Sequence, residues 1–114
     1  MGLRVVRADE PRRVALVGEL DLATVETVLR TLCPLADGVA DAGGNIVVDL
    51  SELTFMDATG LHALVGVARR IRGHATLVLN RPPQSVRRLL GLCDSLIDAE
   101  PALIVEPAEA DGQR

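Results

Sequence analysis

The sequence predicts a single α/β domain, with a mixed sheet of four or five strands packed against three to four helices. Short apolar runs alternate with segments whose apolar residues recur at helical spacing, and 114 residues suit one domain. Hydrophobic residues make up 48% of the chain, but only one residue is aromatic, so Leu, Val, Ile and Ala must build the core. We expect residues 1–106 to form the domain and residues 107–114 to form a short flexible C-terminal tail.

The N-terminal third of the chain predicts two strands followed by a helix. Leu3–Arg7 and Arg13–Gly18 are short apolar runs, and a polar turn between them favours a hairpin. Asp21 is placed to cap a helix whose apolar residues recur at helical spacing over residues 25–32. We expect Pro34 to end or kink this helix, because proline lacks the N–H that continues helical hydrogen bonding.

The middle of the chain predicts a loop, a buried strand and a second long helix. Asp37–Asn45 reads as a Gly-rich loop, and the continuous apolar run Ile46–Leu50 indicates a central strand covered on both faces. Ser51–Asp57 is expected to cross from this strand to a helix at Gly60–Arg72. Gly73 suits the position just after the end of that helix.

The C-terminal part predicts one further strand–helix–strand unit. Ala75–Leu79 reads as a strand, and Pro82 and Pro83 open a third helix, where proline is tolerated in the first turn. The last strand falls either at Ala102–Val105 or nearer Leu96–Ile97. Strand–helix–strand units are parallel and right-handed, whereas a hairpin is antiparallel, so the sheet should be mixed.

Composition argues against several classes of protein. The net charge is −4, and the twelve basic residues form no stripe, which disfavours direct nucleic-acid binding. No apolar run approaches the roughly 20 residues that span a bilayer, and the polar N-terminus does not resemble a signal peptide. We therefore expect a cytoplasmic protein without membrane insertion, in which Cys33 and Cys93 are buried free thiols.

The sequence shows no pattern typical of an enzyme or a metal site. His62 and His74 have no cysteine or carboxylate at ligand spacing. The chain also lacks a nucleophile elbow, and because it contains no lysine it cannot form a lysine-bearing phosphate loop. We expect no catalytic residues and no cofactor.

The most informative segment, Thr54–Leu61, reads TFMDATGL. It places Asp57 at the start of a helix, where free N–H groups and the helix dipole favour negative charge. Gly60 lies in the first turn, although glycine costs about 1 kcal/mol there relative to alanine. Either something approaches the backbone closely at this point, or Asp57 is only a cap and Gly60 only relieves local crowding.

This segment, with IVVDLS before it, resembles the signature of the STAS domains, the anti-sigma factor antagonist family. The residues GELD at Gly18–Asp21 and the segment Pro83–Leu92 resemble two further parts of the family pattern. The resemblance runs in the right order from Leu3 to Leu96, and the combination at this spacing is more specific than any one piece.

The resemblance implies a regulatory binding protein. Members of the family bind an anti-sigma factor that is a serine protein kinase of the histidine-kinase-like ATPase type, and binding frees the sigma factor. The kinase phosphorylates the serine that follows the turn aspartate, and the added charge of about −1.5 to −2 breaks the complex. We expect such a protein to be a monomer or weak homodimer.

The sequence departs from the family pattern at the phospho-acceptor, because Ala58 occupies that position and has no hydroxyl. Thr59 follows it. The switch is then absent, or Thr59 serves as a displaced acceptor, or the domain has another scaffold or binding role. The Thr59 hydroxyl also suits a simple capping role at the helix start.

If the partner docks as the family implies, the start of the second long helix forms the contact surface, and Asp21 lies close to it. The expected partner-binding residues are Asp21, Met56, Asp57, Ala58, Thr59, Gly60, Leu61 and His62.

Two other functions compete with this interpretation. The first is a STAS subunit or scaffold of a membrane transport or signalling assembly, such as a lipid-import ABC transporter, with the membrane segment on a separate chain. The second is an enzyme or nucleotide-binding domain, which no convergent set of titratable groups supports.

Overall fold

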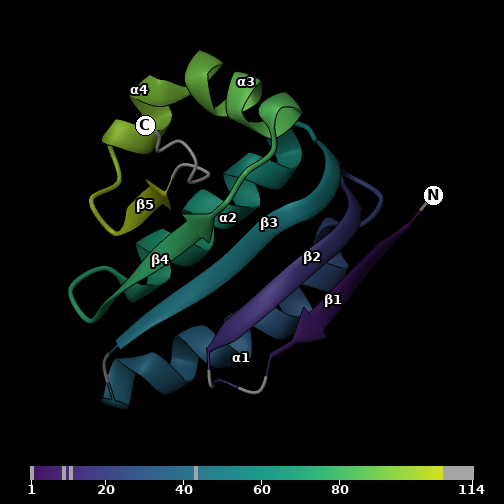
Figure 1. Cartoon of the computed structure of the whole chain (residues 1–114). Helices are drawn as coiled ribbons and strands as arrows, with labels where there is room; N and C mark the ends of the chain where they lie inside the picture. The colour runs from purple at the N-terminus through teal and green to yellow at the C-terminus, as the bar shows by residue number, and fades with distance from the viewer. Residues whose placement is uncertain (1, 9, 11, 43, 107–114) are drawn as a thin grey trace.

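Strands and helices alternate along most of the chain in a computed structural model that describes residues 2–8, 10, 12–42 and 44–106 (Figure 1). Within these residues the predicted α/β class is confirmed, with a mixed sheet of five strands and four helices. The tail 107–114 and two residues of the hairpin turn, Asp9 and Pro11, lie outside the described residues. The elements are β1 Leu3–Arg7, β2 Arg13–Leu20, α1 Val25–Ala42, β3 Gly44–Met56, α2 Ala58–Ile71, β4 Ala75–Asn80, α3 Gln84–Leu92, α4 Asp94–Asp98 and β5 Leu103–Glu106.

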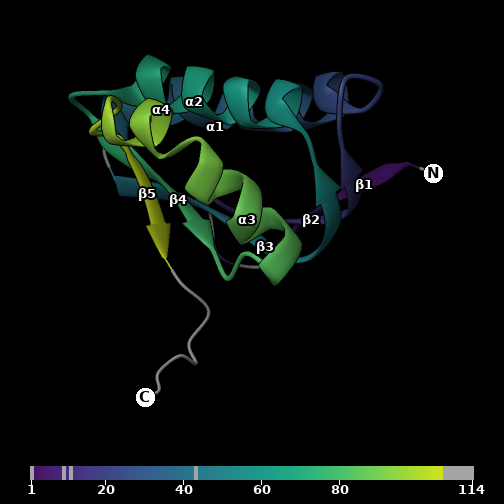
Figure 2. The same ribbon diagram turned by 90° about the horizontal axis from the view of Figure 1, so that it is seen from above.

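The strands lie in the sheet in their order along the chain, β1-β2-β3-β4-β5. β1 and β2 form the predicted antiparallel hairpin, and the remaining neighbours are parallel. Helices α1 and α2 lie side by side on one face of the sheet, and α3 packs against β3 near the point where β3 leads into α2 (Figures 1 and 2). This arrangement brings the ends of β2 and β3 together at one edge of the molecule.

The core is aliphatic, as the composition requires. It fills the space between the sheet and α1 and α2, and the inward residues of β2, β3 and β4 contribute to it together with the buried residues of α1 and α2. Its largest fully buried side chains are Leu16, Leu20, Leu32, Ile46, Leu50, Leu53, Leu61, Leu64, Ile71, Leu77, Leu79 and Val14.

Helix α1 continues through Pro34 to Ala42, so the predicted end near Pro34 and the predicted loop over Asp37–Asn45 are wrong. The apolar stripe explains the difference, because Ala36 and Val39 extend it by another turn and are both buried. Burial of this extra turn outweighs the hydrogen bond that proline removes, although an interior proline costs about 3 kcal/mol.

Strand β3 continues to Met56, so the predicted crossing over Ser51–Asp57 is also wrong. The pairing with β2 shifts twice, because Ala15 pairs with Asp49 whereas Val17 pairs with Glu52, and a second shift follows after Gly18. Each shift is a β-bulge, which inserts an extra residue and reverses the inward and outward faces. The bulges therefore hide the alternation by which a strand is recognised in sequence.

The remaining boundaries differ by a few residues from those expected. Helix α2 begins at Ala58 rather than Gly60, and the last strand is β5 at Leu103–Glu106, close to the first of the two predicted places. The second place, Leu96–Ile97, belongs to α4. Cys33 and Cys93 are free thiols as expected, but they are half-buried rather than buried.

Candidate docking site at the start of α2

The ends of β2 and β3 bring two aspartates to the same edge of the sheet. Leu20 and Met56 are partners in the parallel register, and Asp21 and Asp57 are the residues that follow them. The backbone N–H of Asp57 donates to the carbonyl of Leu20 across 3.2 Å, which ties the two chain segments together. The segments that begin at Asp21 and Asp57, which the sequence analysis assigned to one docking surface, therefore start from adjacent positions.

Asp57 caps α2 as predicted. Its backbone is extended, with φ −108° and ψ −178°, and its Oδ1 atom accepts a hydrogen bond of 3.0 Å from the Gly60 N–H. Its carbonyl accepts from Leu61 N–H at 3.1 Å, so helical hydrogen bonding begins at Asp57. A carboxylate in this place satisfies a free donor and complements the positive end of the helix dipole.

Gly60 is required by a contact within the chain. A Cβ atom at this position would lie 2.6 Å from Cγ of Leu20 and 3.0 Å from the Leu20 carbonyl oxygen. Both residues are buried, so the first turn of α2 sits directly on the end of β2. Of the two explanations offered for Gly60, relief of local crowding therefore accounts for it, because the group that approaches its backbone is Leu20 of β2.

Asp21 organises a turn that precedes α1, and the helix itself begins four residues later at Val25. The Asp21 carboxylate accepts from the N–H of Ala23 at 3.0 Å. Thr24 is buried within the turn, where its hydroxyl donates to the Glu19 carbonyl at 2.7 Å and accepts from the Asp21 N–H at 3.0 Å. This network fixes the loop that lies beside the start of α2.

The eight predicted site residues divide into a buried support and an accessible surface. Met56, Gly60 and Leu61 are buried and hold the turn in place. Among the others, Asp21, Asp57 and Thr59 are half-buried, and Ala58 and His62 are exposed. Within the described residues the Thr59 hydroxyl has no hydrogen-bond partner, so the capping role expected of it is not observed.

The sequence interpretation missed two large apolar side chains beside this surface. Phe55 precedes Met56 and is 46% exposed, and Leu22 follows Asp21 and is 75% exposed. The bulges that obscured β3 also obscured the outward position of Phe55. Leu22 could have been recognised from the sequence, because it is an apolar residue within the polar turn after β2.

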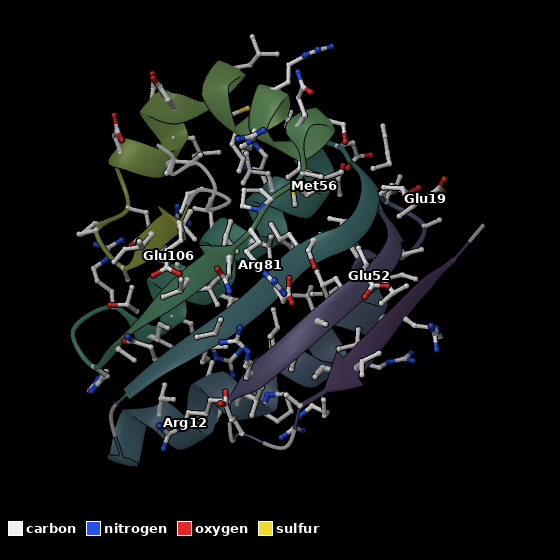
Figure 3. The ribbon with its side chains drawn as sticks, viewed as in Figure 1. Arg12, Glu19, Glu52, Met56, Arg81 and Glu106 are labelled. Carbon is white, nitrogen blue, oxygen red and sulfur yellow. The ribbon has the colours of Figure 1, made fainter. Side chains whose placement is uncertain are left out.

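Acidic residues gather around the same edge. Glu19, Asp21, Glu52 and Asp57 form no ion pair within the described part of the chain. Figure 3 shows Glu19 and Glu52 on one side of the molecule, toward the end of β2, and Arg12 near the opposite end of that strand. Carboxylates therefore gather around the ends of β2 and β3, and Arg4 of β1 lies across β2 from Glu52, because both are register partners of Val17.

Nothing in the described residues points to a metal or a membrane span. No group of three His, Cys, Asp or Glu side chains there is placed to hold a metal ion. None of the described helices combines the length and apolar character needed to cross a bilayer. Two surface hollows, of about 470 Å³ and 260 Å³, have none of the predicted site residues in their lining. The larger is lined by Gly44, Asn45, Arg72, Gly73, His74, Ala75, Thr76, Pro101 and Ala102, and the smaller by Leu29, Cys33, Ala63, Gly66, Val67 and Arg70.

A comparison with protein families identifies the class to which this fold and site belong. The family model described as "Mlab, STAS domain" matches residues 3–95, and the chain therefore belongs to the STAS domain family. A comparison with curated protein sequences gave no match.

Solved structures share the fold. An anti-sigma factor antagonist from Mycobacterium paratuberculosis superimposes with a TM-score of 0.73 at 22% identity, covering 96% of this chain and 89% of its own. The anti-sigma factor antagonist SpoIIAA in its unphosphorylated form gives 0.61 at 20% identity, with coverage of 96% and 91%. The Bacillus cell fate determinant SpoIIAA in its phosphorylated form gives 0.59 at 19% identity, with coverage of 96% and 95%. At these identities the likeness establishes the fold.

Proposed function

We propose that this chain is a regulatory protein of the anti-sigma factor antagonist type, which binds an anti-sigma factor through the start of α2. The partner is a serine protein kinase of the histidine-kinase-like ATPase type. The observation that carries the proposal is the exposed Ala58 in the first turn of a helix fixed by its Asp57 cap and by the Gly60–Leu20 contact. Membership of the STAS family and the anti-sigma factor antagonists among the similar structures support it.

A pre-formed first turn suits protein docking because the partner need not order it on binding. Ala58 presents a methyl group, and Asp57, Thr59 and His62 surround it with polar groups. A phosphate at position 58 would place charge in the middle of this surface, and an alanine has no oxygen to carry it. The surface therefore stays in its binding form at that position.

Thr59 offers the one hydroxyl at the start of α2 that could replace the missing acceptor. Its side chain is half-buried, and its hydroxyl is unengaged within the described residues. We propose the absent switch as the primary interpretation, because the hydroxyl of Thr59 is less accessible than a side chain at position 58. Mass spectrometry of the chain after incubation with kinase and ATP tests this interpretation. Phosphate on Thr59 would contradict an absent switch and would support Thr59 as the displaced acceptor.

The decisive experiment compares the wild type with Ala58→Glu as bait for proteins of the host lysate. The wild type should recover a histidine-kinase-like ATPase serine kinase. The purified kinase should bind the wild type at least about tenfold more tightly than Ala58→Glu, because the contact would bury the new carboxylate and remove its water. Ala99→Glu is the matched control, since Ala99 is an exposed alanine beyond α4. Equal affinity of Ala58→Glu and wild type would remove the α2 start from the contact.

A STAS subunit or scaffold of a membrane assembly is the second candidate. The family model that matches carries the description "Mlab", and Ala58 removes the acceptor on which a phosphorylation switch depends. In that case the bait should recover an ATPase subunit together with a membrane permease. Recovery of these two proteins without a serine kinase would favour this candidate over the first.

A further inference from the structure

The only aromatic side chain of the protein is left outside the core. Phe55 is 46% exposed although the described interior is built from Leu, Ile, Val, Ala and Met, all smaller than Phe. The second β-bulge of β3 produces this position, because Gly18 pairs with Leu53 whereas Glu19 pairs with Phe55. The extra residue, Thr54, donates its hydroxyl to the Gly18 carbonyl at 2.9 Å, which holds the bulge. Phe55 is therefore directed outward while Met56, the next residue, stays buried.

A second exposed apolar side chain lies on the adjacent connection. Leu22 is 75% exposed in the turn after β2. That turn starts beside the residue after Met56, because Leu20 pairs with Met56 and accepts the Asp57 N–H. Buried Thr24 fixes the same turn, so Leu22 is presented by an ordered segment.

Two carboxylates border these two side chains. Glu52 is exposed one residue before Leu53, and Glu19 is the register partner of Phe55. Neither carboxylate pairs with an arginine within the described residues, whereas Glu26, Asp37 and others on the surface do. An exposed aromatic bordered by uncompensated carboxylates complements an apolar pocket bordered by cations.

We infer that the docking surface extends from the start of α2 across the ends of β2 and β3, with Phe55 and Leu22 as its apolar anchors. The occupant is a protein that presents an apolar pocket bordered by Arg or Lys, and Glu52 faces those cations. A few residues carry most of the affinity of an interface, and phenylalanine is among the aromatic residues enriched at interface cores. The inference rests on the proposed function, since the partner is the protein that binds Ala58.

The test measures binding of purified variants to the serine kinase recovered by the wild-type chain. Phe55→Ala should weaken binding at least about tenfold. Ile104→Ala is its matched control, because Ile104 on β5 is also 46% exposed but lies at another edge of the sheet. Glu52→Arg should slow association about tenfold at low ionic strength and less at high salt, and Glu106→Arg should leave the rate unchanged.

The outcomes separate this inference from the proposed function. Full affinity of both Phe55→Ala and Glu52→Arg, with loss of binding in Ala58→Glu, would overturn the extension and keep the α2 start as the contact. No loss in Ala58→Glu, or recovery of no kinase, would overturn the proposed function and this inference with it. Light scattering supplies a further check, because self-association that Phe55→Ala abolishes, without change in kinase binding, would assign the surface to a second copy and overturn the inference.

Discussion

At its first turn α2 presents Ala58 and His62 to solvent without an ion pair in the described structure, whereas at its last turn arginines bind a buried carboxylate. Arg72 donates to both oxygens of Glu100, with Nε–Oε2 and Nη2–Oε1 distances of 3.0 and 2.7 Å. Arg69 approaches the same group at 3.8 Å, and the Ala102 N–H donates to it at 3.2 Å. One end of the helix is closed by interactions within the chain, and the other leaves its surface available.

The contrast lies in which charged and polar groups at each end of the helix already have partners within the chain. The last turn of α2 carries more charge, but Glu100 compensates it and connects α2 to the segment before β5. In the first turn Asp57 accepts the Gly60 N–H and Gly60 packs on Leu20, whereas Ala58 is exposed and contributes no polar group. Substitutions at the two ends should therefore separate folding from binding.

The largest effect is expected from Glu100→Ala at the closed end. The carboxylate is 2% exposed and accepts three hydrogen bonds of at most 3.2 Å, and its removal should lower the free energy of unfolding by about 2–3 kcal/mol. Urea denaturation measures the change. Glu106→Ala, at an exposed glutamate of β5, is the control and should change stability by less than about 0.5 kcal/mol. Similar losses of stability in both variants would contradict the view that the contacts of Glu100 stabilise the last turn of α2.

Two glycines of α2, Gly60 in its first turn and Gly66 in its middle, provide a matched pair. Gly60→Ala should destabilise by about 1–3 kcal/mol, because the new methyl group meets buried Leu20. Gly66→Ala adds the same methyl group where no other atom lies within 4 Å, and it should stabilise by about 0.5–1 kcal/mol through helix propensity. Thermal and urea unfolding measure both changes. A stabilised Gly60→Ala protein would refute the close contact of α2 with β2.

Acid should weaken the closed end selectively. Hydrogen bonds from Arg72 hold the pKa of Glu100 below its ordinary value of about 4.3, although burial acts in the opposite direction. The unfolded chain then binds a proton more readily, so this stability is complete above that ordinary value and is lost as pH falls through the lower folded pKa. Urea titrations from pH 6 to pH 3 should show a steeper loss for the wild type than for Glu100→Gln. Parallel curves for the two proteins would exclude this carboxylate as the cause.

Asp49 adds a smaller contribution of the same sign on the sheet. Its burial raises the pKa, but hydrogen bonds from the Ser51 N–H and from Arg81 outweigh this and lower it overall. The Glu100→Gln protein should therefore keep a shallow dependence on pH in the same acid range.

The smallest stability change is expected for Ala58→Glu. A carboxylate in the first helical turn interacts favourably with the helix dipole, so the free energy of unfolding should rise by up to about 0.5 kcal/mol. The side chain is exposed, so no packing opposes this gain. Chemical denaturation beside the binding measurement checks it. A loss above 1 kcal/mol would mean that reduced binding reports unfolding, and Ala58→Gln would then be needed to separate the two.

Sequence patterns predicted those parts of the fold in which apolar periodicity runs undisturbed. The hairpin and the strand at Ile46–Leu50 were recognised for this reason, although Val47 and Asp49 are half-buried, so the strand is not fully covered on both faces. The prediction failed at Pro34, where tertiary burial of the following turn outweighs a local rule, and along residues 51–56, where two bulges break the alternation. Both failures have long-range causes that a local window does not contain.

The position of the α2 start was predicted from the sequence, but the accessibility of its side chains was not. The motif places Asp57 and Ala58 correctly at the start of α2, but sequence cannot show that Met56 and Leu61 face inward while Phe55 faces outward. That distinction depends on the register between β2 and β3, which is set by the irregular pairing after Gly18.

The bond from the Asp57 N–H to the Leu20 carbonyl makes one amide proton a reporter for the whole edge. Gly60 lies against the same residue, so we expect this hydrogen bond to open only when the turn separates from β2. Its hydrogen exchange should therefore proceed only through the rare openings that unzip the central strands, at rates near those of the core. A mobile loop would exchange there within the time of mixing.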